Sequence, residues 1–128
     1  MCVDDDPEIL ELIELILTNE GYEVKALRGP EDLFRQIREF RPDLIMLDIN
    51  LYGENGLDVC KMIVSNPPTE HIPVIMISAD NSIYTATERY GASDIVLKPF
   101  DIDYLTATVG KFLTAKIIPL SPRPNKGN

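Results

Sequence analysis

Several short apolar segments of this chain end in a side chain that can bind a cation or an anion. The segments and the polar residues that follow them are Val3 with Asp4 and Asp5, 44–47 with Asp48, 74–77 with Ser78, and 95–97 with Lys98. In an open parallel sheet, ligands bind at the carboxyl ends of the strands. If these segments are strands of one sheet, three carboxylates, one hydroxyl and one amine meet in a single shallow pocket.

The chemistry of such a pocket follows from its charges. Three clustered carboxylates repel one another unless a cation lies among them, and oxygen ligands with an open edge suit Mg²⁺. Mg²⁺ also binds phosphate oxygens, while Lys98 can neutralise a further oxygen and the Ser78 hydroxyl can donate to another. Phosphoryl transfer depends on this kind of positioning and charge stabilisation, and an attacking carboxylate yields an acyl phosphate. The residues therefore indicate phosphoryl transfer to a carboxylate.

Amphipathic stretches between the apolar segments are predicted to be helices that hold the strands in place. Pro7 can open the first helix behind an Asp6 cap, and Gly21 supplies its end. The further predicted elements are a strand at 22–27, helices at 33–40, 57–64 and 83–90, and a last helix from Asp101 to Leu113. Strands alternating with helices predict an α/β domain whose parallel sheet is covered on both faces.

Length and composition fit one globular domain, since the chain has 128 residues of which 45% are hydrophobic. A net charge of -9 argues against direct nucleic-acid binding by this domain, which requires clustered Lys and Arg. No apolar run approaches the ~18 residues that span a bilayer, and no signal peptide is evident. We therefore expect a cytoplasmic protein without membrane contacts. Cys2 and Cys60 are expected to be buried, because their spacing fits neither a disulfide framework nor a zinc site.

The helical pattern stops near Ala115. We expect residues 1–114 to form the domain and residues 115–128 to form a disordered tail or linker. The tail is basic and rich in proline and contains no acidic residue, a composition that is typical of linkers and chain ends.

Four motifs, in this order along the chain, resemble those of the receiver domains of two-component response regulators. They are VDDDP from Val3, LDINL from Leu47, ISA from Ile77 and LKPF from Leu97. Each motif is weak alone, but together they span the chain from about Val3 to Leu113. The resemblance implies a doubly wound, five-stranded parallel sheet with strand order 2-1-3-4-5, which is the flavodoxin-like (CheY-like) three-layer sandwich.

The resemblance also implies a role for each polar residue of the pocket. Asp48 would accept the phosphoryl group. Asp5 would bind Mg²⁺ directly and Asp4 through water, while Asn50 would offer its backbone carbonyl to the metal. Two further residues would contact the phosphoryl group: Ser78 would move toward it, and Lys98 would bridge to its oxygens. The resemblance also implies a cis peptide bond between Lys98 and Pro99.

As a member of this family, the chain would be a switch rather than an enzyme, promoting only its own phosphorylation and dephosphorylation. Its phosphodonor would be a sensor histidine kinase or a histidine phosphotransfer protein. Its output would be altered binding of a downstream protein or effector domain through the last two helices and the strand 95–97. The final helix lacks the charged set that pairs some regulators, which weakens the case for a homodimer but leaves it open.

Other functions remain as alternatives. One is a receiver-like module that binds partners without phosphorylation, although the intact acidic set argues against it. Another is a Mg²⁺-dependent phosphohydrolase, which needs a second acid two residues after its nucleophile, where this chain has Asn50. A third is a flavodoxin-like binding module, which needs a phosphate-binding loop after its first strand, where this chain has three aspartates.

The sequence departs from the family pattern in three places. Tyr52 stands where proline is usual, and we expect it to alter the shape of the loop rather than the chemistry. Ile95 replaces an aromatic residue that normally moves together with the Ser or Thr, so the usual relay is in doubt. Only three residues precede Asp4, which predicts a short central strand and reduced stability.

Overall fold

Five parallel strands form the central sheet of the computed structural model, which describes residues 1–117. The strands are β1 (Cys2–Val3), β2 (Ala26–Leu27), β3 (Ile45–Leu47), β6 (Val74–Ser78) and β7 (Asp94–Leu97). Their order across the sheet is β2-β1-β3-β6-β7. When these five strands are numbered along the chain, the order is 2-1-3-4-5, so the predicted fold is confirmed.

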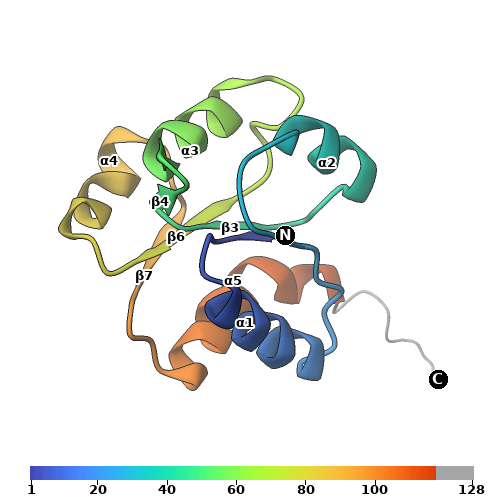
Figure 1. The fold of residues 1–128 in the computed structure, drawn as a ribbon. Helices are drawn as coiled ribbons and strands as arrows, with labels where there is room; N and C mark the ends of the chain where they lie inside the picture. Colours follow the sequence, from blue (N-terminus) through green and yellow to red (C-terminus); the bar gives the residue numbers. More distant parts are fainter. Residues whose placement is uncertain (118–128) are drawn as a thin grey trace.

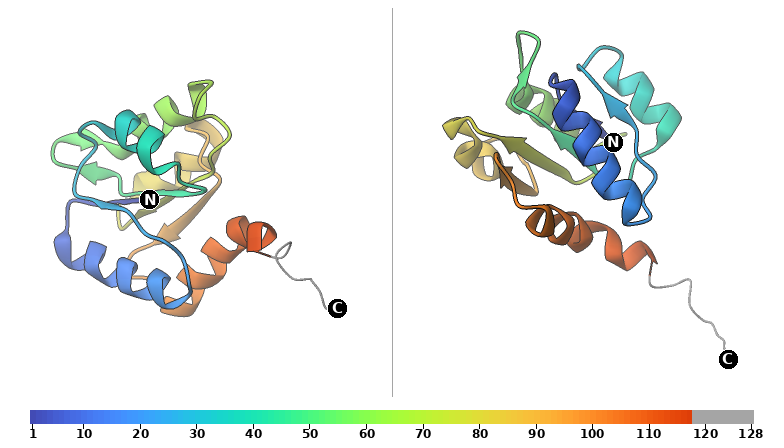
Figure 2. Two further views of the ribbon diagram at one scale, coloured as in Figure 1. Left: turned by 90° about the vertical axis from the view of Figure 1, so that its right-hand side faces the viewer. Right: turned by 60° about the horizontal axis from the view of Figure 1, so that its bottom comes forward.

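Helices cover both faces of this sheet and make three layers (Figure 1). On one face lie α1 (Pro7–Asn19) and α5 (Ile102–Ile117), which contact each other. On the other face lie α2 (Leu33–Phe40), α3 (Gly56–Ser65) and α4 (Ala86–Arg89), the last preceded by the 3-10 turn η1 (Asn81–Thr85). The left view of Figure 2 shows the same separation of α1 and α5 from the other helices.

The core divides in two because successive strand residues point to opposite faces of the sheet. Ile45 and Leu47 pack toward α2 and α3, whereas Met46 between them packs toward α1 and α5. The central strands β3 and β6 are fully buried, as expected for a parallel sheet covered on both sides. This burial fixes the register of the strands and therefore the position of the residue at the end of each strand.

The helix ends follow from capping residues. The Asp6 carboxylate accepts a hydrogen bond from the amide of Glu8 at the start of α1, with Pro7 as the first helical residue, as predicted. α2 ends at Phe40, and Arg41 takes a left-handed conformation with a φ of 54° before Pro42. The predicted end of the fourth helix at Gly91 also agrees with the positive φ of that residue, 82°.

Three local expectations were wrong. The strand predicted at 22–27 pairs only at Ala26–Leu27, because β1 offers only Cys2 and Val3 as partners. The helix predicted at 83–90 begins instead as the 3-10 turn η1. The loop predicted around Gly53 contains a small antiparallel hairpin, β4 (Asn50–Leu51) with β5 (Glu54–Asn55).

The last helix, α5, continues to Ile117, three residues into the segment predicted as a tail. The rest of the predicted tail, 118–128, lies outside the described residues. Among the helices of residues 1–117, none is long and apolar enough to cross a membrane. Cys2 and Cys60 are both buried and are not joined by a disulfide.

Candidate functional site

The carboxyl edge of the sheet brings the predicted polar residues together through the backbone pairing of its strands. The amide of Asp4 donates to the carbonyl of Leu27 on β2, and the amide of Asp48 donates to the carbonyl of Val3 on β1, both at 3.0 Å. The amide of Lys98 donates to the carbonyl of Ser78, also at 3.0 Å. Asp4, Asp48 and Lys98 thus each directly follow a strand, and Ser78 is the last residue of β6.

Lys98 joins the two most buried carboxylates of this edge. Its Nζ donates to Asp4 Oδ2 at 2.8 Å and to Asp48 Oδ2 at 3.0 Å. The side chains of Asp4 and Asp48 are 0% and 7% exposed, and that of Lys98 is 17% exposed. An ion pair so little exposed to water interacts far more strongly than one on the surface.

The second oxygen of Asp48 is held by the loop that follows it. Asp48 Oδ1 accepts a hydrogen bond from the amide of Ile49 at 2.7 Å and a longer one from the amide of Asn50 at 3.5 Å. Gly56 packs against the same backbone: a Cβ at Gly56 would lie 1.9 Å from the carbonyl oxygen of Asp48. Position 56, where the loop after Asp48 ends, therefore has no room for a side chain.

Three carboxylates form a group that fits a metal ion. Asp4, Asp5 and Asp48 each offer an oxygen, and these oxygens lie within 4.8 Å of one another. Asp5 is half-buried, and its carboxylate accepts no hydrogen bond from the side chains and backbone described in residues 1–113. A hard oxygen donor set with one unengaged carboxylate suits Mg²⁺, which keeps several waters when bound to proteins.

Burial and charge shift the pKa values of this cluster. Burial raises the pKa of Asp4, with a further upward contribution from the Asp48 carboxylate, while hydrogen bonds from Lys98 and the amide of Asp6 oppose the rise. Burial works to lower the pKa of Lys98, but its hydrogen bonds to Asp4 and Asp48 outweigh it, and the pKa of Lys98 is raised. Lys98 therefore remains a cation that partly neutralises the carboxylates.

The other predicted residues lie around this centre. Ser78 is buried, and its Oγ accepts a hydrogen bond from the amide of Asp80 at 3.0 Å. Asn50 is exposed on β4. A shallow hollow of about 330 Å³ opens beside the cluster, and its walls include Asp5, Asn50 and Asp80. The peptide bond between Lys98 and Pro99 is cis, as the family resemblance implied.

Comparison with known proteins identifies the family. Residues 1–110 match the response regulator receiver domain. The chain belongs to this family. It is a receiver domain of the kind found in the response regulators of two-component systems.

Curated relatives of this receiver domain are longer proteins. It is 34% identical over 111 residues to the DNA-binding response regulator MtrA of Mycolicibacterium smegmatis, which covers 85% of this chain and 47% of the relative. It is 36% identical over 121 residues to the response regulator PleD of Caulobacter vibrioides, covering 92% of this chain and 26% of the relative. The chain thus spans about half the length of MtrA and about a quarter of PleD.

Solved structures share the fold. The receiver domain of NtrX from Brucella abortus has a TM-score of 0.79 and 33% identity, covering 88% of this chain and 96% of that one. The chemotaxis response regulator CheY4 of Vibrio cholerae has a TM-score of 0.77 at 24% identity, covering 88% of this chain and 95% of that one. At this level of identity, the similarity to CheY4 shows only that the fold is shared.

Sequence reasoning missed Arg28 at the edge of the site, and it expected Tyr52 only to alter the shape of its loop. The Tyr52 hydroxyl accepts a hydrogen bond from Arg28 Nη2 at 2.8 Å and lies 3.5 Å from the backbone oxygen of Asp5. Arg28 directly follows β2, so the rule that polar residues follow the strands would have found it. The contact with Tyr52 depends on the unpredicted hairpin and had no signal in the sequence.

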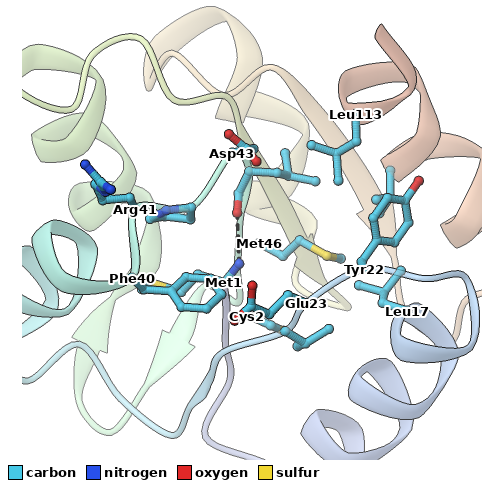
Figure 3. Close-up of a pocket in the computed structure, with 14 residues that line it drawn as sticks. Met1, Cys2, Leu17, Tyr22, Glu23, Phe40, Arg41, Asp43, Met46 and Leu113 are labelled. Atoms are coloured by element: carbon cyan, nitrogen blue, oxygen red, sulfur yellow. Dashed lines mark hydrogen bonds between the residues drawn. The ribbon is translucent and has the colours of Figure 1, made fainter. Parts of the chain in front are cut away.

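A second hollow lies at the opposite, amino edge of the receiver domain's sheet, near the chain start (Figure 3). It has a volume of about 160 Å³, and its walls include Met1, Leu17, Tyr22 and Leu113. The Met1 amine donates a hydrogen bond of 2.9 Å to the carbonyl of Leu44 in this hollow, shown as a dashed line. None of the predicted site residues lines it.

Proposed function

We propose that this receiver domain accepts a phosphoryl group on Asp48, in a Mg²⁺-dependent reaction, from a phosphohistidine donor. The observation that carries the proposal is the bridge from Lys98 to Asp4 and Asp48, with Asp5 close beside it. Preorganised charges of this kind act where the charge of a transferring phosphoryl group develops.

Each residue has a part in the proposed transfer. One oxygen of the Asp48 carboxylate attacks the phosphorus and forms a new P–O bond, while the P–N bond to the donor imidazole breaks. The bond electrons and a proton stay with the imidazole, and Asp48 becomes an acyl phosphate. Lys98 is positioned to hold a phosphoryl oxygen, since its ammonium is already 3.0 Å from Asp48 Oδ2.

The acidic cluster fits Mg²⁺. Asp5 and Asp48 would hold it directly, Asp4 would act through water, and Asn50 would contribute its backbone carbonyl. When bound, Mg²⁺ supplies positive charge that offsets the repulsion between the carboxylates and the incoming phosphoryl oxygens. Lys98 would then be free to leave the carboxylates and face the phosphoryl group.

The output would be a change in protein binding. The hydroxyl of Ser78 accepts from the amide of Asp80 at the start of η1, so a move of Ser78 toward the phosphoryl group would disturb η1 and α4. The surface beside them carries exposed apolar side chains, among them Tyr84, Leu97 and Ile102. This surface would bind a downstream protein or effector domain, and a histidine kinase or histidine phosphotransfer protein would be the donor.

A direct test is phosphorylation by a small donor. The protein is incubated with acetyl phosphate and Mg²⁺, and the intact mass is read. We expect one added phosphoryl group, absent from the Asp48→Asn variant and from a sample without Mg²⁺. Wild type that stays unmodified with acetyl phosphate and with several histidine kinases would contradict the proposal and favour a module that binds partners without phosphorylation.

A further inference from the structure

Tyr52 occupies an unusual position at the tip of the hairpin formed by β4 and β5. Leu51 pairs with Glu54, which leaves Tyr52 and Gly53 as a two-residue turn with φ values of 48° and 84°. Turns with two positive φ values favour Asn and Gly, and a bulky side chain there is uncommon. Proline, the usual family residue, cannot adopt this φ. The position therefore points to a contribution from the tyrosine side chain.

The side chain of Tyr52 connects three loops at the carboxyl edge of the sheet. Its hydroxyl accepts from Arg28 Nη2 at 2.8 Å in the loop after β2, and donates to the backbone oxygen of Asp5 at 3.5 Å in the loop after β1. A Cβ at Gly29 would lie 3.5 Å from Tyr52 Cδ2, so the ring also lies along the loop after β2. The hairpin is thus fastened to two loops that are distant in sequence.

This connection lies beside the acidic cluster. Tyr52, Asp5 and Asn50 are neighbouring walls of the hollow of about 330 Å³ next to the acidic cluster. The side chain would otherwise be free to move, because Tyr52 is 62% exposed and sits on a short turn. The hydrogen bond from Arg28 is charge-assisted, which makes it stronger than a bond between neutral groups.

We propose that Tyr52 is a positioning residue: held by Arg28, it forms a strap along the Asp5 side of the acceptor pocket and slows loss of the phosphoryl group from Asp48. The inference rests on the proposed function of Asp48 as the acceptor. It goes further by assigning regulation of the lifetime of the phosphorylated state to two residues that are not part of the acceptor chemistry.

The step that the strap slows is hydrolysis of the acyl phosphate. Water attacks the phosphorus, the P–O bond to Asp48 breaks, and the bond electrons return to the Asp48 carboxylate. The water loses its proton to solvent, and inorganic phosphate leaves through the hollow. A fixed wall limits the directions from which water can approach, whereas a mobile wall opens them.

The Tyr52 hydroxyl and the Arg28 guanidinium should affect the lifetime of the phosphorylated state through the one hydrogen bond that joins them. We expect Tyr52→Phe and Arg28→Met each to lose the phosphoryl group roughly fivefold faster, the factor that corresponds to about 1 kcal/mol. The double variant should be no faster than either single variant, since both changes remove the same bond. Arg28→Lys keeps a cationic donor and should retain most of the lifetime.

The lifetime is measured by phosphorylating each protein, removing the donor, and following the intact mass with time. Tyr22→Phe is the matched control, because it makes the same chemical change at the opposite edge of the sheet and should leave the lifetime unchanged. Additive effects of Tyr52→Phe and Arg28→Met, or lifetimes equal to wild type, would overturn the proposal.

A second measurement follows the position of the Tyr52 ring without any phosphorylation. Tb³⁺ replaces Mg²⁺ in oxygen sites, and a tyrosine close to bound Tb³⁺ sensitises its luminescence. We expect sensitised luminescence in wild type, loss in Asp5→Asn, and a clear decrease in Arg28→Met, which keeps both the ring and the acidic cluster. Equal luminescence in wild type and Arg28→Met would contradict the strap.

The two measurements separate the inference from the proposed function. If Asp48 accepts no phosphoryl group, the proposed function is wrong and the lifetime role of the strap falls with it, whatever the luminescence shows. If Asp48 is phosphorylated but the lifetimes and the luminescence do not change among the variants, the proposed function stands and the strap is wrong.

Discussion

The two edges of the central sheet hold their charged groups in opposite ways, and β7 connects them. At its amino end, Asp94 accepts from Lys111 Nζ at 2.7 Å, in a pair whose lysine side chain is 62% exposed. Just after its carboxyl end, Lys98 bridges Asp4 and Asp48 in a pair of contacts nearly closed to water. Aspartate and lysine therefore form an exposed ion pair at one edge and a largely buried cluster of charges at the other.

The difference shows where this receiver domain departs from the arrangement that stability alone would favour. Two buried carboxylates beside a half-buried third repel one another, and one lysine compensates only in part. The amino edge has no such cluster among the described residues and is filled mainly by apolar side chains. Functional sites commonly carry this kind of local instability.

The largest difference in stability between the two edges should appear when a glycine near each edge is replaced by alanine. At Gly56 the new Cβ would lie 1.9 Å from the carbonyl oxygen of Asp48 and 2.9 Å from Ile49 Cα, both rigid backbone atoms. We expect Gly56→Ala to lower the free energy of unfolding by about 3 kcal/mol or more, since the loop after Asp48 must move. Urea denaturation measures the change.

Gly21, near the amino edge, is the matched control. Its φ is 94°, but a Cβ there would meet no atom within 4 Å. Gly21→Ala should therefore cost only the strain of the left-handed conformation, about 1 kcal/mol. Equal losses at Gly56 and Gly21 would show that the loop after Asp48 is not as closely packed as the distances indicate.

The second comparison removes one lysine from each edge. Lys98→Met should destabilise the domain by about 3 kcal/mol, because it leaves Asp4 and Asp48 buried without their shared cation. Mg²⁺ should restore part of this loss, since it binds the same carboxylates. Thermal unfolding with and without Mg²⁺ measures both effects.

Lys111→Met makes the same chemical change at the exposed pair. We expect only a small change in melting temperature and no dependence of that change on Mg²⁺, because exposed ion pairs contribute little. A destabilisation as large as that of Lys98→Met would mean that the two edges do not differ in the way their burial suggests.

The contrast between the edges also separates what the sequence could predict from what it could not. The meeting of Asp4, Asp48 and Lys98 follows from apolar runs that each end in a polar residue, whereas the strand order came from the resemblance to receiver domains. The runs before Asp48 and Ser78 are long enough to specify strands, whereas the strand before Asp4 is only two residues long, and the parallel sheet brings the ends of these strands together. The bridge from Lys98 to Asp4 and Asp48 was not predicted, because the sequence placed Lys98 only beside the oxygens of a phosphoryl group.

Other features depend on contacts between segments that are distant in sequence. β2 is short because β1 offers only two residues, not because its own composition changes at Ala26. The bond between Arg28 and Tyr52 requires a hairpin whose turn has none of the usual residues at its first position. Sequence patterns describe each segment separately, so they do not predict these contacts between segments.

A smaller effect is expected from filling the hollow at the amino edge. Two apolar residues added ahead of Met1 would extend β1 between β2 and β3 and cover the walls around Met1 and Tyr22. We expect a gain of about 1 kcal/mol in the free energy of unfolding, from the apolar area removed from water. A Gly-Ser extension is the control, since it lengthens the chain without adding apolar side chains. Equal stabilities of the two extended proteins would contradict the expectation.

The smallest effect concerns the Met1 amine itself, which burial holds at a pKa below its ordinary value of 8.0, although the charge of Asp43 opposes the shift. In the window between that lowered pKa and 8.0, the unfolded chain binds the proton more than the folded chain does. The free energy of unfolding should therefore rise as the pH is raised through this window and level off above it. Urea denaturation at a series of pH values measures the slope. Either extension moves the amine into solvent and should remove this contribution. A slope that is the same in the 128-residue chain and in the Gly-Ser extended protein would show that other groups cause it, and that the amine is not buried in solution.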